Sequence, residues 1–279
     1  MGKVALITGA NGGDGKYLQE ILYDKNYSVY CYNGDILDSR KLHNYIVSVL
    51  PDEIYHLAAL SSIKECEIDN IKAIETNCIA TLSIINTIRY SSIKLFFAGS
   101  SAASSQTMYG LTKEFSTQLI NLARKDDIFA CTGIMHNHTG KYSSNKFVVK
   151  KFIEEVVKIK YNKSKCVYVG NLETCKDFGY AKDYMNAAHL MLQQDRPKDY
   201  IISSNNITKI KDILYYIFLK LNIDDPEKYI KVDKSLFKKD EQISLKDYAA
   251  HISELGWRQT KTIYEVIDEM IEYECKKYI

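Results

Sequence analysis

The sequence predicts an α/β protein whose core is a doubly wound parallel sheet, with a smaller, interleaved C-terminal lobe. Short apolar runs alternate with helical patterns through the first half of the chain. These runs are rich in β-branched residues and show little polar alternation, as is typical of strands buried on both faces. A glycine-rich turn joins the first run to the first helical pattern, which indicates a strand–turn–helix unit.

The elements of the N-terminal half follow in a regular order. Strands are expected at residues 3–10, 28–33, 52–59, 94–101 and 129–135. Helices, with apolar residues spaced by three and four, are expected between them at residues 16–27, 39–50, 71–92 and 109–126. Because a helix separates each strand from the next, the strands are expected to be parallel and covered by helices on both faces.

The alternation breaks after about residue 136. A polar loop and then an amphipathic helix are expected at residues 137–145 and 146–161. Further strands are expected at 166–171 and 200–205, with helices at 180–195 and within 253–277. We therefore expect a first lobe of residues 1–135, completed by segments within 165–205, and a second lobe of residues 136–164 and 206–279.

The composition argues against several classes of function. With 37 Lys and Arg against 35 Asp and Glu, the net charge of +2 gives no large field to attract nucleic acid or an anionic membrane. No apolar stretch approaches the ~20 residues of a membrane span, and the N-terminal one is too short for a signal peptide. We therefore expect a cytosolic chain. Its six His and seven Cys lack ligand spacing, so no metal site is expected.

The stretch "TGANGGDG" predicts a dinucleotide site at the first turn. Glycine permits the tight turn and lets the backbone approach a pyrophosphate, whose charge then lies at the N-terminus of the following helix. A strand before the turn and a helix after it supply the context that a glycine triplet needs. The expected cofactor-binding residues here are Gly9, Asn11, Gly12, Gly13, Asp14 and Gly15.

The end of the second strand bears on the choice between NAD and NADP. An acidic residue there favours the free ribose hydroxyl of NAD, and a basic one favours the 2′-phosphate of NADP. The chain has the neutral Asn33 at this place, with Arg40 and Lys41 near in sequence, so NADP(H) is favoured slightly over NAD(H). Asp35 and Ile36 are expected at the adenine. The third strand is expected to end beside the cofactor with Leu57, Ala58 and Ala59.

The segment "AGSSAASSQTMYGLTK" carries the candidate catalytic residues. Tyr109 and Lys113 lie four residues apart at the start of a helix, where the ammonium lowers the pKa of the phenol and also holds the nicotinamide ribose. Ser100 or Ser101 can hydrogen-bond a developing oxyanion. No Asp or Glu occurs between Leu95 and Lys113. The segment suits the exchange of a hydride and a proton better than removal of a proton from carbon.

These motifs together resemble the extended short-chain dehydrogenase/reductases. Other stretches, such as "PDEIYHLAA", "VGNLETCKDFGYAKDY" and "ELGW", resemble the GDP-mannose 4,6-dehydratases over most of the chain. That family has a Rossmann lobe and a smaller lobe that binds a nucleoside-diphosphate sugar. The resemblance implies that a nucleotide sugar is bound by Asn137, Lys150, Asn171, Lys176, Lys238 and Glu241, with Lys in place of the family's Arg at three of these positions.

Two departures from the family affect the expected function. An insertion that reaches a neighbouring subunit's cofactor is missing after the second strand, which favours a homodimer over a tetramer. The family's catalytic glutamate falls on Ala102, in a shortened loop. We therefore expect an NAD(P)H-dependent reductase of a nucleotide-linked 4-keto-6-deoxy sugar, with GDP as the favoured nucleotide.

Three alternatives to the reductase stay open. One is a 4,6-dehydratase with a displaced base. A second is an epimerase that uses Cys131, His136 or His138. The third is a non-catalytic dinucleotide-binding protein, for which the shortened loop argues.

Overall fold

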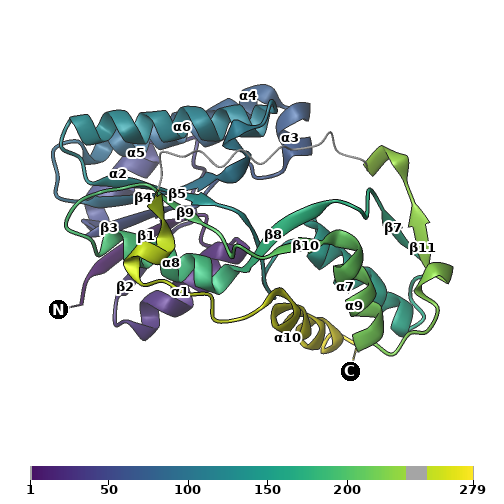
Figure 1. The fold of residues 1–279 in the computed structure, drawn as a ribbon. Coiled ribbons are helices and arrows are strands. Elements are labelled where there is room, and N and C mark those ends of the chain that lie inside the picture. Colours follow the sequence, from purple (N-terminus) through teal and green to yellow (C-terminus); the bar gives the residue numbers. More distant parts are fainter. Residues whose placement is uncertain (1, 237–249, 279) are drawn as a thin grey trace. The chain divides into compact units, whose positions relative to one another are not determined.

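The computed structural model describes residues 2–236 and 250–278 (Figure 1). The chain divides into two compact units. The first comprises Met1–His136, Tyr184–Ile202 and Gln242–Arg258, and the second comprises Asn137–Asp183, Ser203–Glu241 and Gln259–Ile279, as far as these ranges are described. Within the described residues, no helix is long and apolar enough to span a membrane.

A parallel sheet forms the centre of the first unit. Among the described residues its strand order is β12-β9-β5-β4-β3-β1-β2, and every neighbouring pair is parallel. The strands are β1 (Val4–Thr8), β2 (Ser28–Tyr32), β3 (Glu53–His56), β4 (Lys94–Ser100), β5 (Ala130–Met135), β9 (Tyr200–Ile202) and β12 (Ala250–His251). The prediction of a doubly wound, Rossmann-type sheet is therefore confirmed.

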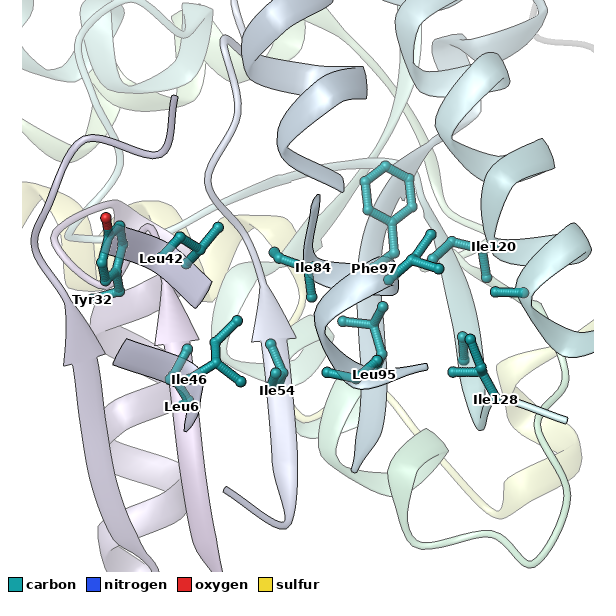
Figure 2. Packing of buried hydrophobic residues seen from close by; sticks show 14 residues of the cluster. Leu6, Tyr32, Leu42, Ile46, Ile54, Ile84, Leu95, Phe97, Ile120 and Ile128 are labelled. Carbon is teal, nitrogen blue, oxygen red and sulfur yellow. The ribbon is translucent and has the colours of Figure 1, made fainter. Parts of the chain in front are cut away.

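Helices cover both faces of this sheet (Figure 1). One layer is formed by α2 (Ser39–Val49), α5 (Ala80–Ile88) and α6 (Met108–Lys125), while α1 (Gly13–Asp24) and α8 (Ala181–Leu192) lie opposite. Figure 2 shows Leu42 and Ile84 on the first layer packed against Leu6, Ile54 and Leu95 of the strands. All five side chains are fully buried, which explains the continuous apolar strand sequences.

A long helix was expected at residues 71–92, and the structure divides this region. It is formed by α4 (Asn70–Ile74), a π-helical turn η1 (Glu75–Ile79) and then α5, and α3 (Ile63–Ile68) precedes it. The side chain of Asp69 caps α4 by accepting a hydrogen bond from the backbone nitrogen of Lys72 (2.9 Å). π-Helical turns are rare and occur frequently at functional sites, and this one contains the buried Asn77.

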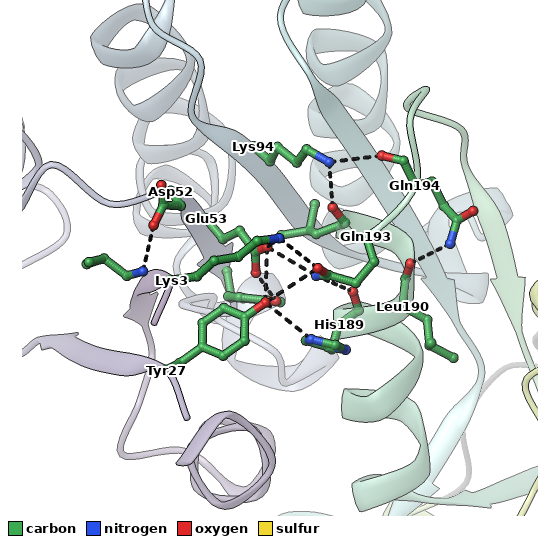
Figure 3. A network of polar contacts seen from close by, with 12 residues as sticks. Lys3, Tyr27, Asp52, Glu53, Lys94, His189, Leu190, Gln193 and Gln194 are labelled. Carbon is green, nitrogen blue, oxygen red and sulfur yellow. Dashed lines mark hydrogen bonds and ion pairs between the residues drawn. The ribbon is translucent and has the colours of Figure 1, made fainter. Parts of the chain in front are cut away.

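A network of polar side chains joins α8 to the amino-terminal ends of the strands (Figure 3). The carboxylate of Glu53, only 1% exposed, accepts hydrogen bonds from Lys3 Nζ (2.9 Å), Tyr27 Oη (3.2 Å), Tyr55 Oη (2.7 Å) and Gln193 Nε2 (3.1 Å). These donors compensate the desolvation of a buried carboxylate. The network lies at the opposite end of the strands from the glycine turn.

In its described residues, the second unit contains short strands and the helices α7 (Val148–Lys160), α9 (Ile210–Lys220) and α10 (Ile263–Cys275). β10 (Ile207–Lys209) pairs antiparallel with β8 (Cys175–Tyr180), and β8 pairs parallel with β6 (Asn137–Thr139). β11 (Ile230–Val232) pairs with β7 (Val167–Val169). α10 begins with a capping box formed by Thr262 and Glu265.

The observed units differ from the expected lobes in two places. The strand expected at 166–171 forms as β7 but pairs within the second unit, as does β8, which was not expected. Residues 250–258 were expected in the second lobe, yet they belong to the first unit. The reason is that β12 extends the large sheet beside β9, and the ring of Trp257 packs edge-on against Tyr184 of α8.

Candidate functional site

The glycine turn after β1 has a geometry that only glycine satisfies. Gly9 has a φ of +77°, and a Cβ on it would lie 2.7 Å from the backbone nitrogen of Ala58. A Cβ on Gly15 would lie 2.5 Å from the carbonyl oxygen of Gly9. Helix α1 begins at Gly13, so its N-terminus points at the turn. This close strand–turn–helix packing fits a bound pyrophosphate.

The neutral end of β2 lies across this turn. Asn11 Nδ2 donates a hydrogen bond to Asn33 Oδ1 at 3.3 Å, which links two predicted cofactor residues from separate elements. Lys41, one of the two basic residues expected near a 2′-phosphate, forms an ion pair with Asp38 at 2.9 Å, and Arg40 is exposed. Asn33 is exposed as well and can contact either a ribose hydroxyl or a phosphate.

The remaining predicted cofactor residues follow β2 and β3. Asp35 accepts from the backbone nitrogen of Leu37 through its side chain (3.0 Å), and its carbonyl oxygen accepts from Tyr32 Oη (3.1 Å). Ile36 packs against the apolar core of the first unit. Leu57 and Ala58, after the end of β3, lie directly beside Gly9 of the glycine turn. Ala59 follows them in the same loop.

Tyr109 and Lys113 lie in the first two turns of α6. Lys113 is 3% exposed, and its Nζ donates to the carbonyl oxygen of Ala98 on β4 at 2.7 Å. The same Nζ lies 4.9 Å from the ring centroid of Phe97 and 5.9 Å from that of Tyr109. Burial lowers the pKa of Lys113 to about 8. The predicted phenol–ammonium pair is therefore assembled at the carboxyl end of β4.

The shortened loop between β4 and α6 forms a compact turn. Ser100, the last residue of β4, accepts a hydrogen bond from the backbone nitrogen of Ala102 through its Oγ (3.2 Å), and Ser101 opens the 3₁₀-helix η2 (Ser101–Ser104). Gly110 of α6 packs on this turn, where a Cβ would lie 2.4 Å from the carbonyl oxygen of Ala102. Ala102, where the resemblance places the family's glutamate, thus packs through its carbonyl oxygen against the start of α6.

A chain of buried hydrogen bonds connects β1 to the π-helical turn. His56 Nδ1 lies 2.7 Å from Thr8 Oγ1, and its Nε2 lies 3.1 Å from Thr81 Oγ1. Thr81 donates onward to the carbonyl oxygen of Asn77 (2.7 Å). Because that donation leaves Thr81 to accept from the ring, the His56 proton is assigned to Nε2. Burial lowers the pKa of His56 to about 3, so the ring is neutral.

Asn77 then extends this network to α6. Its Oδ1 accepts from the backbone nitrogen of Leu60 (2.8 Å), and its Nδ2 donates to the Leu60 carbonyl (3.2 Å) and to Thr112 Oγ1 (2.9 Å). Thr112 in turn donates to the carbonyl oxygen of Tyr109 (2.9 Å). The sequence analysis missed His56, Asn77 and Thr112, since polar residues inside apolar segments give no sign of their partners.

A carboxylate from another element lies at the start of α6. Oε1 of Glu67 on α3 accepts a hydrogen bond from the backbone nitrogen of Met108 at 2.8 Å. Met108 is the first residue of α6 and precedes Tyr109. Glu114, which follows Lys113, instead accepts from Gln118 further along the helix (3.0 Å). Glu67 is distant in sequence from residues 95–113, and no pattern in the sequence links it to them.

The predicted substrate-binding residues that are described lie in the second unit, by the limits of the units given above. Lys150 is buried, and its Nζ forms an ion pair with Glu274 at 2.7 Å, so this ammonium is already held by a carboxylate. Asn171 accepts from the backbone nitrogen of Glu173 (3.0 Å), while Asn137 and Lys176 lie on β6 and β8. Lys238 and Glu241 lie outside the described residues.

The three residues considered for an epimerase lie on different elements. Cys131 is completely buried in the middle of β5, with its Sγ 3.6 Å from the carbonyl oxygen of Leu95. Burial raises the pKa of this thiol, which opposes formation of a thiolate. His136 is buried after the end of β5, and His138 lies on β6. Cys131 is therefore a core residue, closed off from solvent.

The residues present fit a dinucleotide. The glycine turn, the N-terminus of α1, the neutral Asn33 and the Tyr109–Lys113 pair all lie in the first unit, at the carboxyl ends of adjacent parallel strands. A pyrophosphate would be held by the turn from Gly9 to Gly15, and the nicotinamide ribose by Lys113. Within the described residues, no group of three or more His, Cys, Asp or Glu side chains is arranged to hold a metal ion.

Comparisons with known proteins agree with this geometry. Residues 30–270 match the family model described as GDP-mannose 4,6 dehydratase. The GDP-mannose 4,6-dehydratase of Vibrio cholerae serotype O1 is 26% identical over 354 residues, covering 99% of this chain and 94% of that protein. The human GDP-mannose 4,6 dehydratase is 28% identical over 274 residues, covering 79% of this chain and 74% of its own length.

Solved structures share the fold over nearly the whole chain. The structure of RMD from Pseudomonas aeruginosa complexed with NADPH superposes with a TM-score of 0.86 at 18% identity and covers 99% of both chains. A UDP-glucose 4-epimerase from Thermotoga maritima with UDP-glucose has a TM-score of 0.88 at 19% identity, covering 99% of this chain and 100% of that one.

Proposed function

Because the chain belongs to the GDP-mannose 4,6-dehydratase family of extended short-chain dehydrogenase/reductases, we propose that it is a 4-ketoreductase acting on a nucleotide-linked sugar. The proposed substrate is a 4-keto-6-deoxy hexose or heptose carried on GDP. The coarser assignment, to an NAD(P)-dependent enzyme of sugar nucleotides, follows from the family itself. The preference for reduction over dehydration depends on the residues between β4 and α6.

The observation that carries the proposal is the side chain at position 102. Dehydration requires a base that removes a proton from C5 of the sugar after C4 has been oxidised, and a positioned carboxylate suits that step. The chain has Ala102 where the family has glutamate, and no carboxylate between Leu95 and Lys113. Reduction of a ketone needs a proton donor instead, and Tyr109 is one.

The chain's own residues can complete such a reduction. When bound, the reduced nicotinamide supplies the hydride that C4 of the sugar receives. Tyr109 donates its phenolic proton to the C4 oxygen, so the C=O double bond becomes a C–OH single bond. Lys113, held by the Ala98 carbonyl, stabilises the phenolate that remains. Ser100 or Ser101 offers a hydroxyl to the oxygen while its negative charge develops.

NADP(H) is the proposed cofactor. Asn33 brings no negative charge to the end of β2, so it does not repel a 2′-phosphate, and the exposed Arg40 and the Lys41 ammonium are near in sequence. The Lys41 ammonium forms an ion pair with Asp38, so it would have to contact the 2′-phosphate and this carboxylate together.

The direct test mixes the purified protein with NADPH and the 4-keto product that a GDP-mannose 4,6-dehydratase makes. We expect loss of NADPH absorbance and formation of a 6-deoxy sugar nucleotide. Tyr109→Phe should lower kcat by roughly 10²- to 10⁴-fold, because it removes the proton donor. If no 4-keto sugar nucleotide oxidises NADPH, or if Tyr109→Phe leaves the rate unchanged, the reductase assignment is wrong.

A 4,6-dehydratase with a displaced base is the second candidate, favoured by the family and by Glu67 beside the start of α6. It predicts that GDP-mannose or a GDP-heptose is converted to a 4-keto product without net consumption of cofactor. The same two incubations therefore separate the candidates, since the reductase leaves GDP-mannose unchanged.

The protein is proposed to act as a homodimer. The segment formed by α4, η1 and α5 lies beside α6 in the first unit (Figure 1). Large apolar side chains on these helices are 36–71% exposed, and those on α6 recur at the spacing of a helix-packing face. They are Ile71, Ile79, Leu82, Leu111, Phe115 and Leu122. A second copy presenting the same helices would cover this face.

A further inference from the structure

The contact between Glu67 and Met108 joins two elements that border the catalytic tyrosine. Glu67 lies in the last turn of α3, which follows the loop after β3. Its Oε1 accepts the backbone N–H of Met108, which has no partner within α6 because the first donors of a helix have none. A carboxylate is a strong acceptor at this position because the N-terminus of a helix carries partial positive charge.

The rest of the first turn of α6 is held from its other side. Thr107 Oγ1 accepts from the backbone nitrogen of Gly110 (3.1 Å) and lies 2.8 Å from Ser105 Oγ. Gly110 packs so closely on the end of η2 that a Cβ would lie 2.5 Å from Oγ of Ser105, the residue that follows η2. The turn that carries Tyr109 is thus fixed between η2 and Glu67. Loss of either contact would allow the first turn to move.

We propose that Glu67 is a positioning residue that fixes Tyr109 for proton transfer, an inference that rests on the proposed ketoreductase function. Its carboxylate acts by accepting the Met108 N–H and takes no proton from the substrate. The distinction can be tested, because a glutamine at position 67 keeps a carbonyl oxygen that accepts the same N–H and yet is no base. If Glu67 needs only to accept this hydrogen bond, Gln can replace it with little loss of activity. If Glu67 is a general base, Gln cannot replace it.

The kinetic experiment compares Glu67→Gln and Glu67→Ala with the wild type in the NADPH assay. We expect Glu67→Ala to lower kcat by roughly ten- to a hundred-fold, since small displacements of a catalytic group have effects of this size. Glu67→Gln should stay within roughly threefold of the wild type. Glu75→Ala is the control, because it removes another exposed carboxylate near α6. If Gln is as damaging as Ala, Glu67 acts through its basicity and the inference is overturned.

Hydrogen exchange gives a readout that does not depend on the substrate. In the protein without substrate, the amide of Met108 should exchange faster in Glu67→Ala than in the wild type, and Glu67→Gln should restore protection. If the Met108 amide exchanges faster in Glu67→Ala but the wild type does not reduce the substrate, the reductase function is refuted while the Glu67–Met108 hydrogen bond is supported. Unchanged exchange in Glu67→Ala, or changed exchange with unchanged kcat, would refute the positioning role itself.

Discussion

At the scale of single residues, burial tunes the group that assists Tyr109. The sequence shows that Lys113 is one helical turn from the phenol, but only the structure shows that it is 3% exposed and held by the Ala98 carbonyl. An ammonium in such surroundings is disfavoured, and its pKa falls from the ordinary 10.5 to about 8. The burial of Lys113 at the proposed catalytic site therefore lowers the stability of the folded protein.

The first prediction concerns this loss of stability. Between pH 8 and 10.5, Lys113 is largely neutral in the folded protein but protonated in the unfolded chain. The unfolded chain therefore binds more protons, and the free energy of unfolding rises with pH across this range. At pH 7 the folded protein holds a buried cation. Lys113→Met should therefore raise the free energy of unfolding at pH 7 by about 1–3 kcal/mol, while activity is lost.

Urea denaturation at pH 7 and at pH 10 measures this effect. The gain from Lys113→Met should shrink at the higher pH, where the wild-type lysine is neutral in the folded protein. A variant less stable than the wild type at pH 7 would contradict the prediction, and would show that the hydrogen bond to Ala98 outweighs desolvation.

The second prediction concerns cofactor choice. Asn33→Asp places a carboxylate where the structure has an exposed amide, and this charge repels a 2′-phosphate but can accept from a 2′-hydroxyl. The ratio of kcat/KM for NADPH to that for NADH should fall about tenfold or more, equivalent to about 1.4 kcal/mol. Asn33→Ala is the control, since it removes the hydrogen bond from Asn11 without adding charge. An equal fall in both variants would show that charge is not the cause.

At the scale of elements, the π-helical turn η1 connects the loop after β3 to the catalytic helix. Asn77 is 1% exposed and bridges the backbone of Leu60 to Thr112, which in turn holds the carbonyl of Tyr109. The wider turn of a π-helix brings this residue to its partners. The continuous helix expected from the sequence would not have shown these contacts, because the apolar periodicity of residues 71–92 is compatible with either geometry.

The third prediction tests this connection. Asn77→Ala leaves the partly buried N–H of Leu60 without its acceptor and removes the donor to the buried Thr112 Oγ1, which should lower the free energy of unfolding by about 1–3 kcal/mol. The shift of the urea midpoint measures it. Asn86→Ala on the exposed face of α5 is the control and should change stability by about 0.5 kcal/mol or less. Equal effects of the two variants would refute the proposed bridging role.

At the scale of the whole molecule, the chain divides its residues between two units. The first contains the complete dinucleotide turn and the Tyr109–Lys113 pair, and the second contains the described residues predicted to bind the nucleotide sugar. Lys150 shows that a lysine in place of the family's arginine can be held inside its own unit, by Glu274. The choice of nucleotide therefore stays a prediction for the remaining positions.

The fourth prediction concerns assembly. Phe115 is 53% exposed on α6, within the apolar face proposed to meet a second copy. Phe115→Glu would bury two like charges at a two-fold contact, so light scattering should show a dimer for the wild type and a monomer for the variant. Leu219→Glu, on an exposed leucine of α9 in the second unit, is the control and should remain dimeric. A monomeric wild type would refute the homodimer.

The amount that the sequence could predict differs between the sheet and the site. The strands of the N-terminal half were predicted because their apolar, β-branched runs repeat at regular intervals, and Gly9 and Gly15 were identified from the glycine spacing between an apolar run and a helical pattern. Tyr109 and Lys113 were identified because four residues make about one helical turn. Each of these signals is local in the chain.

Glu67, Asn77 and residues 250–258 could not be predicted in the same way. Their partners are Met108, Thr112 and β9, all distant in sequence, and nothing in the neighbouring residues signals such pairings. The sequence by itself determined the alternation of strands and helices, the glycine turn and the phenol–ammonium pair. Only the tertiary structure decided which carboxylate lies beside the catalytic helix and how deeply Lys113 is buried, because burial and long-range hydrogen bonds arise when distant segments pack together.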